Sequence, residues 1–151
     1  MRRNARGAAL LVVLVLGLVL AFAESRSSRD EAVSLAIAGD YEKAYQIFRA
    51  LLREAPEDPL LNYYAGATCV RMNKLAEGIG YLEGAVRQKA PFPQAYEELA
   101  EAYLKKKLNS QARDLVEKGL SLFPKNRRLR DLQIKIKMKT ESEALKERPE
   151  R

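Results

Sequence analysis

The feature that most constrains this chain is a repeat of about 34 residues in its pattern of small and apolar side chains. Five sets of positions recur in three copies: Ala32, Gly66, Ala100; Leu35, Cys69, Tyr103; Ala44, Gly78, Ala112; Phe48, Leu82, Val116; Leu52, Val86, Leu120. A repeat of this length is one supersecondary unit, which buries its apolar face only against its neighbours. The sequence therefore predicts a stack of similar units.

Within each unit the apolar residues recur at helical spacing. The stripe in the first unit consists of Ala44, Ile47, Phe48, Leu51, Leu52 and Ala55, one face of an amphipathic helix. Two helices of this kind, joined by a short polar turn, make an αα-hairpin. Pro56 and Pro124, which cannot continue a helix, end the first and third units. The predicted fold class is all-α.

Capping residues mark where several helices should begin. Ser28 and Glu31 have the spacing of a capping box. Asp58 precedes Pro59, so it should cap a helix that has proline at its first position. Asn126 is placed to cap the last helix in the same way.

The repeated columns resemble those of tetratricopeptide repeat (TPR) proteins over about residues 25–126. The third unit fits best, with Tyr96, Leu99, Ala100, Tyr103, Ala112 and Pro124 in the slots of that family. The resemblance implies an α-solenoid of three helix-turn-helix hairpins within 24–126, divided as 25–58, 59–92 and 93–126.

A stack of hairpins leaves its last apolar face open, and residues 127–147 are placed to cover it. Leu129, Leu132 and Ile136 lie at helical spacing, although "QIKIKMK" alternates as a strand would. We expect a basic capping helix, because an isolated strand at the end of a helical stack has no pairing partner. Ile134 or Met138 should then be partly exposed, and residues 148–151 form a tail.

The first residues have the organisation of an export leader. "MRRNAR" is basic, Gly7 to Ala23 is an apolar run without charge, and Ala21-Phe22-Ala23 is a small-x-small cleavage signal. Residues 1–23 are therefore a signal peptide or, in the alternative, an uncleaved anchor at the lower length limit for spanning a bilayer. The style of the leader suggests a bacterial periplasm, or its inner membrane facing the periplasm.

The resemblance also implies a concave groove lined by the first helix of each unit. The residues in groove-facing slots are Arg29, Val33, Ala36, Ile37, Tyr63, Ala67, Val70, Arg71, Glu97, Glu101, Leu104 and Lys105. The middle unit would supply an aromatic and aliphatic floor with Arg71 beside it, and the third unit an acidic and a basic edge. Such a surface suits a protein or peptide ligand, extended or helical, with apolar anchors.

One known variant of this family, the clamp that cytosolic chaperone adaptors use for a terminal carboxylate, does not fit. Its positions are occupied here by Arg29, Val33, Tyr64, Gln94 and Glu98. Only Arg29 has a suitable side chain, and Glu98 would repel a carboxylate.

Composition argues against an enzyme. The chain has no histidine and one cysteine, Cys69, which occupies a packing column. No metal-ligand cluster, nucleophile–base pair or phosphate-binding glycine loop is present in the sequence, so we expect no catalytic residues, metal or cofactor.

The basic charge is concentrated at the C-terminal end. Residues 24–124 carry 14 Lys/Arg against 15 Asp/Glu, whereas residues 125–151 carry 10 against 5. The segment 125–139 either is a solvated helix face or contacts anionic lipid; because of the leader we expect no nucleic acid partner.

Gly80 and Gly84 lie on one helix face, and the packing columns do not require either of them. Their presence reflects either sequence drift on a tolerant surface or the close approach of another chain.

Overall fold

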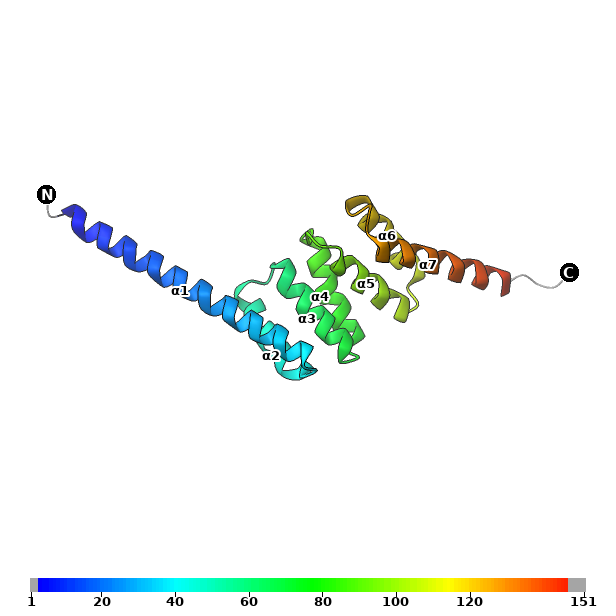
Figure 1. Ribbon diagram of the computed structural model, residues 1–151, viewed down its shortest axis with the longest axis horizontal. Coiled ribbons are helices and arrows are strands. Elements are labelled where there is room, and N and C mark those ends of the chain that lie inside the picture. The colour runs from blue at the N-terminus through cyan, green and yellow to red at the C-terminus, as the bar shows by residue number, and fades with distance from the viewer. Residues whose placement is uncertain (1–2, 147–151) are drawn as a thin grey trace.

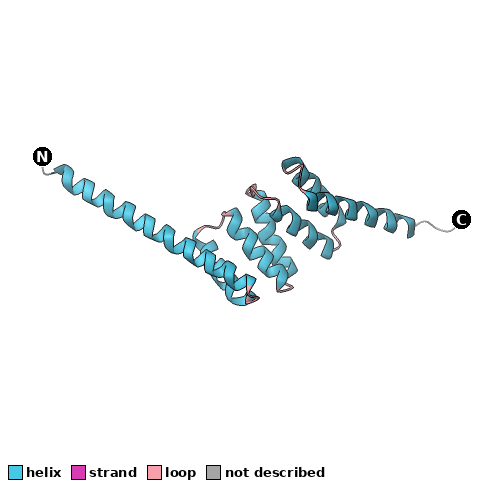
Figure 2. Cartoon of the chain, in the orientation of Figure 1, coloured by secondary structure: helices cyan, strands magenta, loops and turns pink. Residues whose placement is uncertain are grey.

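The computed structural model describes the backbone of residues 3–146 and the side chains of residues 13–20 and 23–142. The described part consists of helices and loops and has no strand (Figure 2). The helices are α1 (Arg3–Ile37), α2 (Tyr41–Glu54), α3 (Pro59–Arg71), α4 (Leu75–Arg87), α5 (Gln94–Lys105), α6 (Asn109–Leu122) and α7 (Arg127–Lys146). The all-α prediction is confirmed.

The helices form a stack of three hairpins and a cap. The hairpins are α1–α2, α3–α4 and α5–α6, and they pack on one another through α2 with α3 and α4 with α5. Helix α7 packs on α6 and α5 and so covers the end of the stack. The N-terminal end of α1 and the C-terminal end of α7 lie at opposite ends of the long axis (Figure 1).

The turn inside each hairpin repeats with the same period as the sequence. Gly39, Asn73 and Lys107, which occupy equivalent positions in the three units, have left-handed φ angles of 88°, 61° and 62°. In each turn the residue after the left-handed one donates its N–H to the carbonyl five residues before it, at 2.9 Å. These hydrogen bonds run from Asp40 to Leu35, from Lys74 to Cys69 and from Leu108 to Tyr103. This left-handed C-terminal cap satisfies carbonyls that the helix end leaves free, and it reverses the chain in the same way three times.

The small columns mark where paired helices cross closely. A Cβ added at Gly66 of α3 would lie 2.9 Å from the carbonyl oxygen of Gly78 in α4, and one added at Gly78 would lie 3.0 Å from that of Gly66. The bulky column fills the interior, because Phe48, Leu82 and Val116 are all fully buried. The packing predicted from both kinds of column is confirmed.

Gly84 leaves space for a buried side chain of the partner helix in the same hairpin. A Cβ at this position would lie 2.8 Å from Oδ1 of Asn62, whose Nδ2 donates to the carbonyls of Pro56 (2.8 Å) and Asp58 (2.9 Å). The glycine therefore accommodates a buried, fixed amide of α3, and the interpretation that packing does not require it was wrong. Gly80 has no atom within 4 Å of an added Cβ.

Two of the expected helix caps form. Oδ1 of Asp58 accepts from the N–H groups of Leu60 (2.8 Å) and Leu61 (3.0 Å) at the start of α3. Oδ1 of Asn126 accepts from the N–H of Leu129 at 2.8 Å at the start of α7. Both side chains satisfy backbone donors that the first helical turn leaves free.

The capping box expected at Ser28 and Glu31 was wrong. Ser28 lies inside α1, and its hydroxyl donates to the carbonyl of Glu24 at 3.0 Å, four residues earlier. Residues 18–38 contain neither glycine nor proline, so nothing in this stretch ends the helix. Helix α1 consequently runs unbroken across the expected boundary between residues 23 and 24.

The cap helix α7 buries one face against the third hairpin. Leu129, Leu132 and Ile136 are 0%, 5% and 3% exposed, whereas Ile134 and Met138 on other faces are 57% and 65% exposed. The predicted helix, its buried face and its exposed apolar residues are confirmed.

The ends of the chain lie partly outside the described residues. Of the predicted leader or anchor 1–23, residues 1–2 are not described, nor are the side chains of 3–12 and 21–22; the predicted tail 148–151 is outside as well. Among the residues that are described, no helix is long and apolar enough to cross a membrane.

Candidate peptide-binding groove

The first helices of the three units and the cap form a continuous inner row. The backbone of α3 lies within 8 Å of both α1 and α5, and that of α5 lies within 8 Å of α7. The second helices α2, α4 and α6 do not approach one another in this way within the described chain. The first helices of successive units therefore lie closer to one another than the second helices do. This difference curves the stack, and the inner row forms its concave face.

The predicted groove residues differ in how much of each side chain solvent reaches. Partly exposed side chains are those of Arg29, Val33, Ala36, Tyr63, Ala67, Glu101 and Leu104; those of Ile37, Arg71 and Lys105 are exposed. Val70 and Glu97 are buried, at 9% and 6% exposure. These two help to hold adjacent helices together and do not form an open surface, while the remaining assignments stay predictions.

An aromatic series crosses the middle of the stack. The ring of Tyr63 meets that of Phe92 edge-on at 5.2 Å and that of Tyr64 at 5.3 Å. Tyr64 in turn stacks on Phe48 at 5.6 Å. Burial, followed by the nearby Glu98 carboxylate, raises the pKa of Tyr63, so its hydroxyl is a neutral hydrogen-bonding group at physiological pH. The floor is aromatic and packed ring against ring, with one polar edge.

The acidic edge expected in the third unit is neutralised by the cap helix. Arg128 Nε lies 3.5 Å from Glu97 Oε2, and Arg128 Nη2 donates to Glu101 Oε1 at 2.8 Å. Asn126 Nδ2 donates to the other oxygen of Glu97 at 2.9 Å. The bond to Glu101 is the main reason that the pKa of Arg128 is raised. The two carboxylates are thus held by α7 and present little free negative charge.

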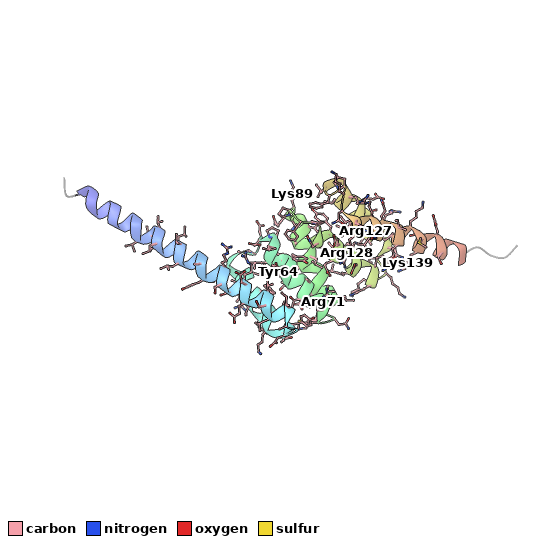
Figure 3. All side chains as sticks on the ribbon, in the orientation of Figure 1. Tyr64, Arg71, Lys89, Arg127, Arg128 and Lys139 are labelled. Atoms are coloured by element: carbon pink, nitrogen blue, oxygen red, sulfur yellow. The ribbon has the colours of Figure 1, made fainter. Side chains whose placement is uncertain are left out.

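A second ion pair joins the middle and third units across the groove. Arg71 Nη2 lies 3.6 Å from Glu98 Oε1, and the Arg71 side chain remains 60% exposed while that of Glu98 is only 15% exposed. The pair leaves one face of Arg71 open to a ligand. In Figure 3, Arg71 lies below the middle of the stack and Arg128 lies where α7 meets α5.

A hollow of about 310 Å³ lies between α5 and α7, at the C-terminal end of the inner row. Glu101, Leu104 and Lys105 line it from α5, and Lys135 and Lys139 from α7. The last two were expected only as members of the basic segment 125–139. The signal that distinguishes them is their spacing of four residues, which puts both on one helix face.

The described residues offer no evident catalytic chemistry. No group of three or more His, Cys, Asp or Glu side chains among them is arranged to hold a metal ion. Cys69 is fully buried, and burial raises the pKa of its thiol to about 11. The cysteine is therefore a packed, protonated side chain at neutral pH.

Comparison with known proteins gives a clear result only at the level of structure. No family model and no curated protein matches the sequence. The TPR domain of Sgt2 from Aspergillus fumigatus superposes with a TM-score of 0.77 at 18% identity, covering 85% of this chain and 86% of that chain. At such identity the similarity establishes a shared fold.

Two further solved structures of the same fold contain bound peptides. The first TPR domain of Spaghetti (RPAP3), bound to an HSP90 peptide, has a TM-score of 0.72 at 19% identity and covers 77% of this chain and 92% of that chain. The Yersinia enterocolitica type III secretion chaperone SycD, in complex with a peptide of the translocator YopD, has a TM-score of 0.70 at 20% identity, with coverage of 76% and 93%. The fold predicted from the repeat is confirmed.

Proposed function

We propose that this chain, which has the fold of TPR domains, is a non-enzymatic module that binds a peptide or helix of a partner protein along its inner row of helices. The observation that carries the proposal is the accessible concave surface of α3 and α5. There a packed aromatic floor at Tyr63 lies beside the open face of the Arg71–Glu98 pair. Peptides bound to two proteins of the same fold support this assignment.

The chemistry of the surface fits a ligand with apolar anchors and a few charges. Tyr63, Ala67 and Leu104 are partly exposed, so a ligand side chain placed on them removes apolar area from water without rearranging the core. Arg71 and the lysines at the end of the row fix the register by charge. Because Tyr63 is already packed against Tyr64 and Phe92, little of its conformational entropy remains to be lost on binding.

The proposed setting is the bacterial envelope, with the chain exported or held at the inner membrane by its N-terminal run. The apolar side chains described between Val13 and Leu20 are 52% to 74% exposed. Nothing in the described part of the chain covers this run, which supports an environment other than water around it. The mass of the N-terminus in membrane and soluble fractions decides between cleavage and anchoring.

A membrane-tethered accessory subunit is the second candidate, favoured by the same exposed run. In this version α1 joins the tether directly to the first hairpin. Since α7 lies at the other end of the long axis from the N-terminus (Figure 1), a bilayer around the run would not also lie against the basic cap. The tethered version therefore does not require lipid contact by residues 125–139.

The test of groove binding compares two arginines that end the two helices of the middle unit. Arg71 ends α3 on the inner row and Arg87 ends α4, a second helix, and both side chains are exposed. Peptides selected from a displayed library of short random sequences are measured by fluorescence anisotropy against Arg71→Glu and Arg87→Glu. We expect Arg71→Glu to weaken binding of most selected peptides about tenfold and Arg87→Glu to leave it unchanged.

Equal effects of the two substitutions would place the peptide elsewhere and refute the groove. Failure of the library to yield any peptide that competes for the inner row would refute peptide binding itself. Circular dichroism of both variants checks that each remains as helical as the wild type.

A further inference from the structure

The hollow between α5 and α7, called here the lysine hollow, combines an apolar floor with three ammonium groups. Leu104 is partly exposed, Lys105 and Lys135 are exposed, and Lys139 is partly exposed. The volume of about 310 Å³ accommodates a few ligand side chains. The hollow continues the inner row, because α5 is the first helix of the third unit and α7 packs directly on it.

The basic residues of α7 that face this side follow one line along the helix. Arg128, Lys135 and Lys139 are separated by seven and four residues, so they share a face, and Arg128 reaches Glu101 of α5. Figure 3 labels Arg128 and Lys139 along α7. Lys135 and Lys139 form an i, i+4 pair of like charge, an arrangement that destabilises a helix. Asp131, four residues before Lys135 on the same helix, forms its ion pair with Arg127 instead, at 4.0 Å.

No described carboxylate forms an ion pair with any of the three lysines of the hollow. The one acid in the lining, Glu101, is held by Arg128 at 2.8 Å. Its neighbour Glu97 is bound by Arg128 and Asn126. Arg128 thus holds Glu97 and Glu101 at one end of the hollow, and among the described side chains no carboxylate compensates the three ammonium groups around Leu104.

We propose that the lysine hollow binds an acidic segment of the partner protein, whose carboxylates contact Lys105, Lys135 and Lys139 while an apolar side chain rests on Leu104. The proposal rests on the proposed function and specifies the ligand's charge and its place along the groove. An acidic protein segment complements both the ammonium groups and the apolar floor, and it extends along the row toward Arg71. A lipid head group would meet the charges only.

The experiment uses the full chain in non-ionic detergent and short random peptides displayed as a library. Wild-type protein is expected to enrich peptides with more Asp and Glu than the library average. The matched control is built into α7: Lys135 lines the hollow, whereas Lys137, two residues on and also exposed, lines the opposite side between α6 and α7. Lys135→Glu should weaken the selected acidic peptides about tenfold, and Lys137→Glu should leave their affinity unchanged.

A charge-swapped peptide gives the second measurement. Replacing the acidic residues of a selected peptide by lysine should abolish binding to wild type and restore it to the Lys135→Glu, Lys139→Glu double variant. Restoration requires a folded protein with the peptide at this site, so it distinguishes a direct contact from damage to α7. Higher salt should weaken the wild-type complex, because ions screen the contacts between exposed charges.

The outcomes separate the two proposals. Selected peptides that depend on Arg71 but carry no acidic excess, or that bind Lys135→Glu and Lys137→Glu equally, would overturn the lysine hollow and leave the groove function standing. A library without any peptide dependent on the inner row would overturn both. If the chain instead floats with phosphatidylglycerol vesicles more than with neutral ones, loses this preference in Lys135→Glu, and selects no acidic peptides, the hollow is a lipid site and the proposal is wrong.

Discussion

Glycine-to-alanine substitutions at Gly66 and Gly80 should change the stability of the protein in opposite directions. Both residues lie inside helices of the middle hairpin, Gly66 in α3 and Gly80 in α4. Alanine is favoured over glycine in a helix interior by about 1 kcal/mol at either place. The two positions differ in what the new methyl group meets, so their comparison isolates the close crossing of the two helices.

At Gly80 an added Cβ meets nothing within 4 Å, so the full gain of about 1 kcal/mol should appear as higher stability. At Gly66 the same atom would lie 2.7 Å from Cγ of Leu82 and 2.9 Å from the carbonyl oxygen of Gly78. Overpacking a core costs about 1–3 kcal/mol, and a contact with backbone lies at the upper end because the helix itself has to move. Subtracting the propensity gain leaves Gly66→Ala about 2 kcal/mol less stable than wild type.

The assay is urea unfolding of the full chain in non-ionic detergent, followed by far-ultraviolet circular dichroism. With a slope of about 2 kcal/mol per molar urea, Gly80→Ala should raise the midpoint by about 0.5 M and Gly66→Ala should lower it by about 1 M. A Gly66→Ala variant as stable as Gly80→Ala would show that α3 and α4 are not in contact at this crossing, and the account of the small columns would fail. Since Gly78 occupies the same crossing, the Gly66→Ala, Gly78→Ala double variant should lose less stability than the sum of the single variants.

Two further substitutions test the cap helix and the repeated turn. Asn126→Ala removes the N-cap of α7 and one of the hydrogen bonds to buried Glu97. The free energy of unfolding should therefore fall by about 2–3 kcal/mol in the same urea assay. A loss below about 0.5 kcal/mol would contradict this role. Lys107→Gly should stabilise the protein by about 0.5–1 kcal/mol because Lys107 has a left-handed φ of 62°. The control Lys106→Gly, at a φ of −82°, should destabilise the protein. A change in stability of the same sign in both variants would refute the argument.

The parts of the fold that the sequence predicted are those determined within one repeat. Asp58 acts on N–H groups two and three residues away, and the apolar positions 35, 69 and 103 recur at equal spacing because each occupies the same place in its hairpin, five residues before the N–H that its carbonyl accepts in the turn. Local chemistry of this kind is visible in a single chain. The capping box predicted at Ser28 is also a local motif, but it does not form because Ser28 lies inside α1. The N–H groups inside a helix already donate to carbonyls of the same helix, so none is left for the box to bind.

Contacts between residues far apart in sequence account for the features that were missed. The acidic edge assigned to Glu97 and Glu101 is neutralised by Arg128, which belongs to the cap helix beyond the last repeat. Gly84 is required by the amide of Asn62, which lies on the partner helix of the same hairpin. Neither set of contacts joins residues of one repeat column, so the period carries no information about them. Burial of a carboxylate becomes apparent only when the helix that supplies its cation is in place.

Helix α7 lies outside the repeat, and it determines the charge of the groove as well as closing the stack. Its buried residues Leu129, Leu132 and Ile136 fix how it lies on the third hairpin. Because the faces of a helix turn together, the buried face of α7 also fixes where its basic face lies. Arg128 consequently reaches Glu101 of α5, and Lys135 and Lys139 lie in the hollow with Leu104. A change in those buried residues that rotated α7 would therefore both weaken the stack and expose the acids of α5. We therefore expect the charge preference of the proposed groove to depend on the cap as well as on the repeats, and the repeat does not constrain the sequence of the cap.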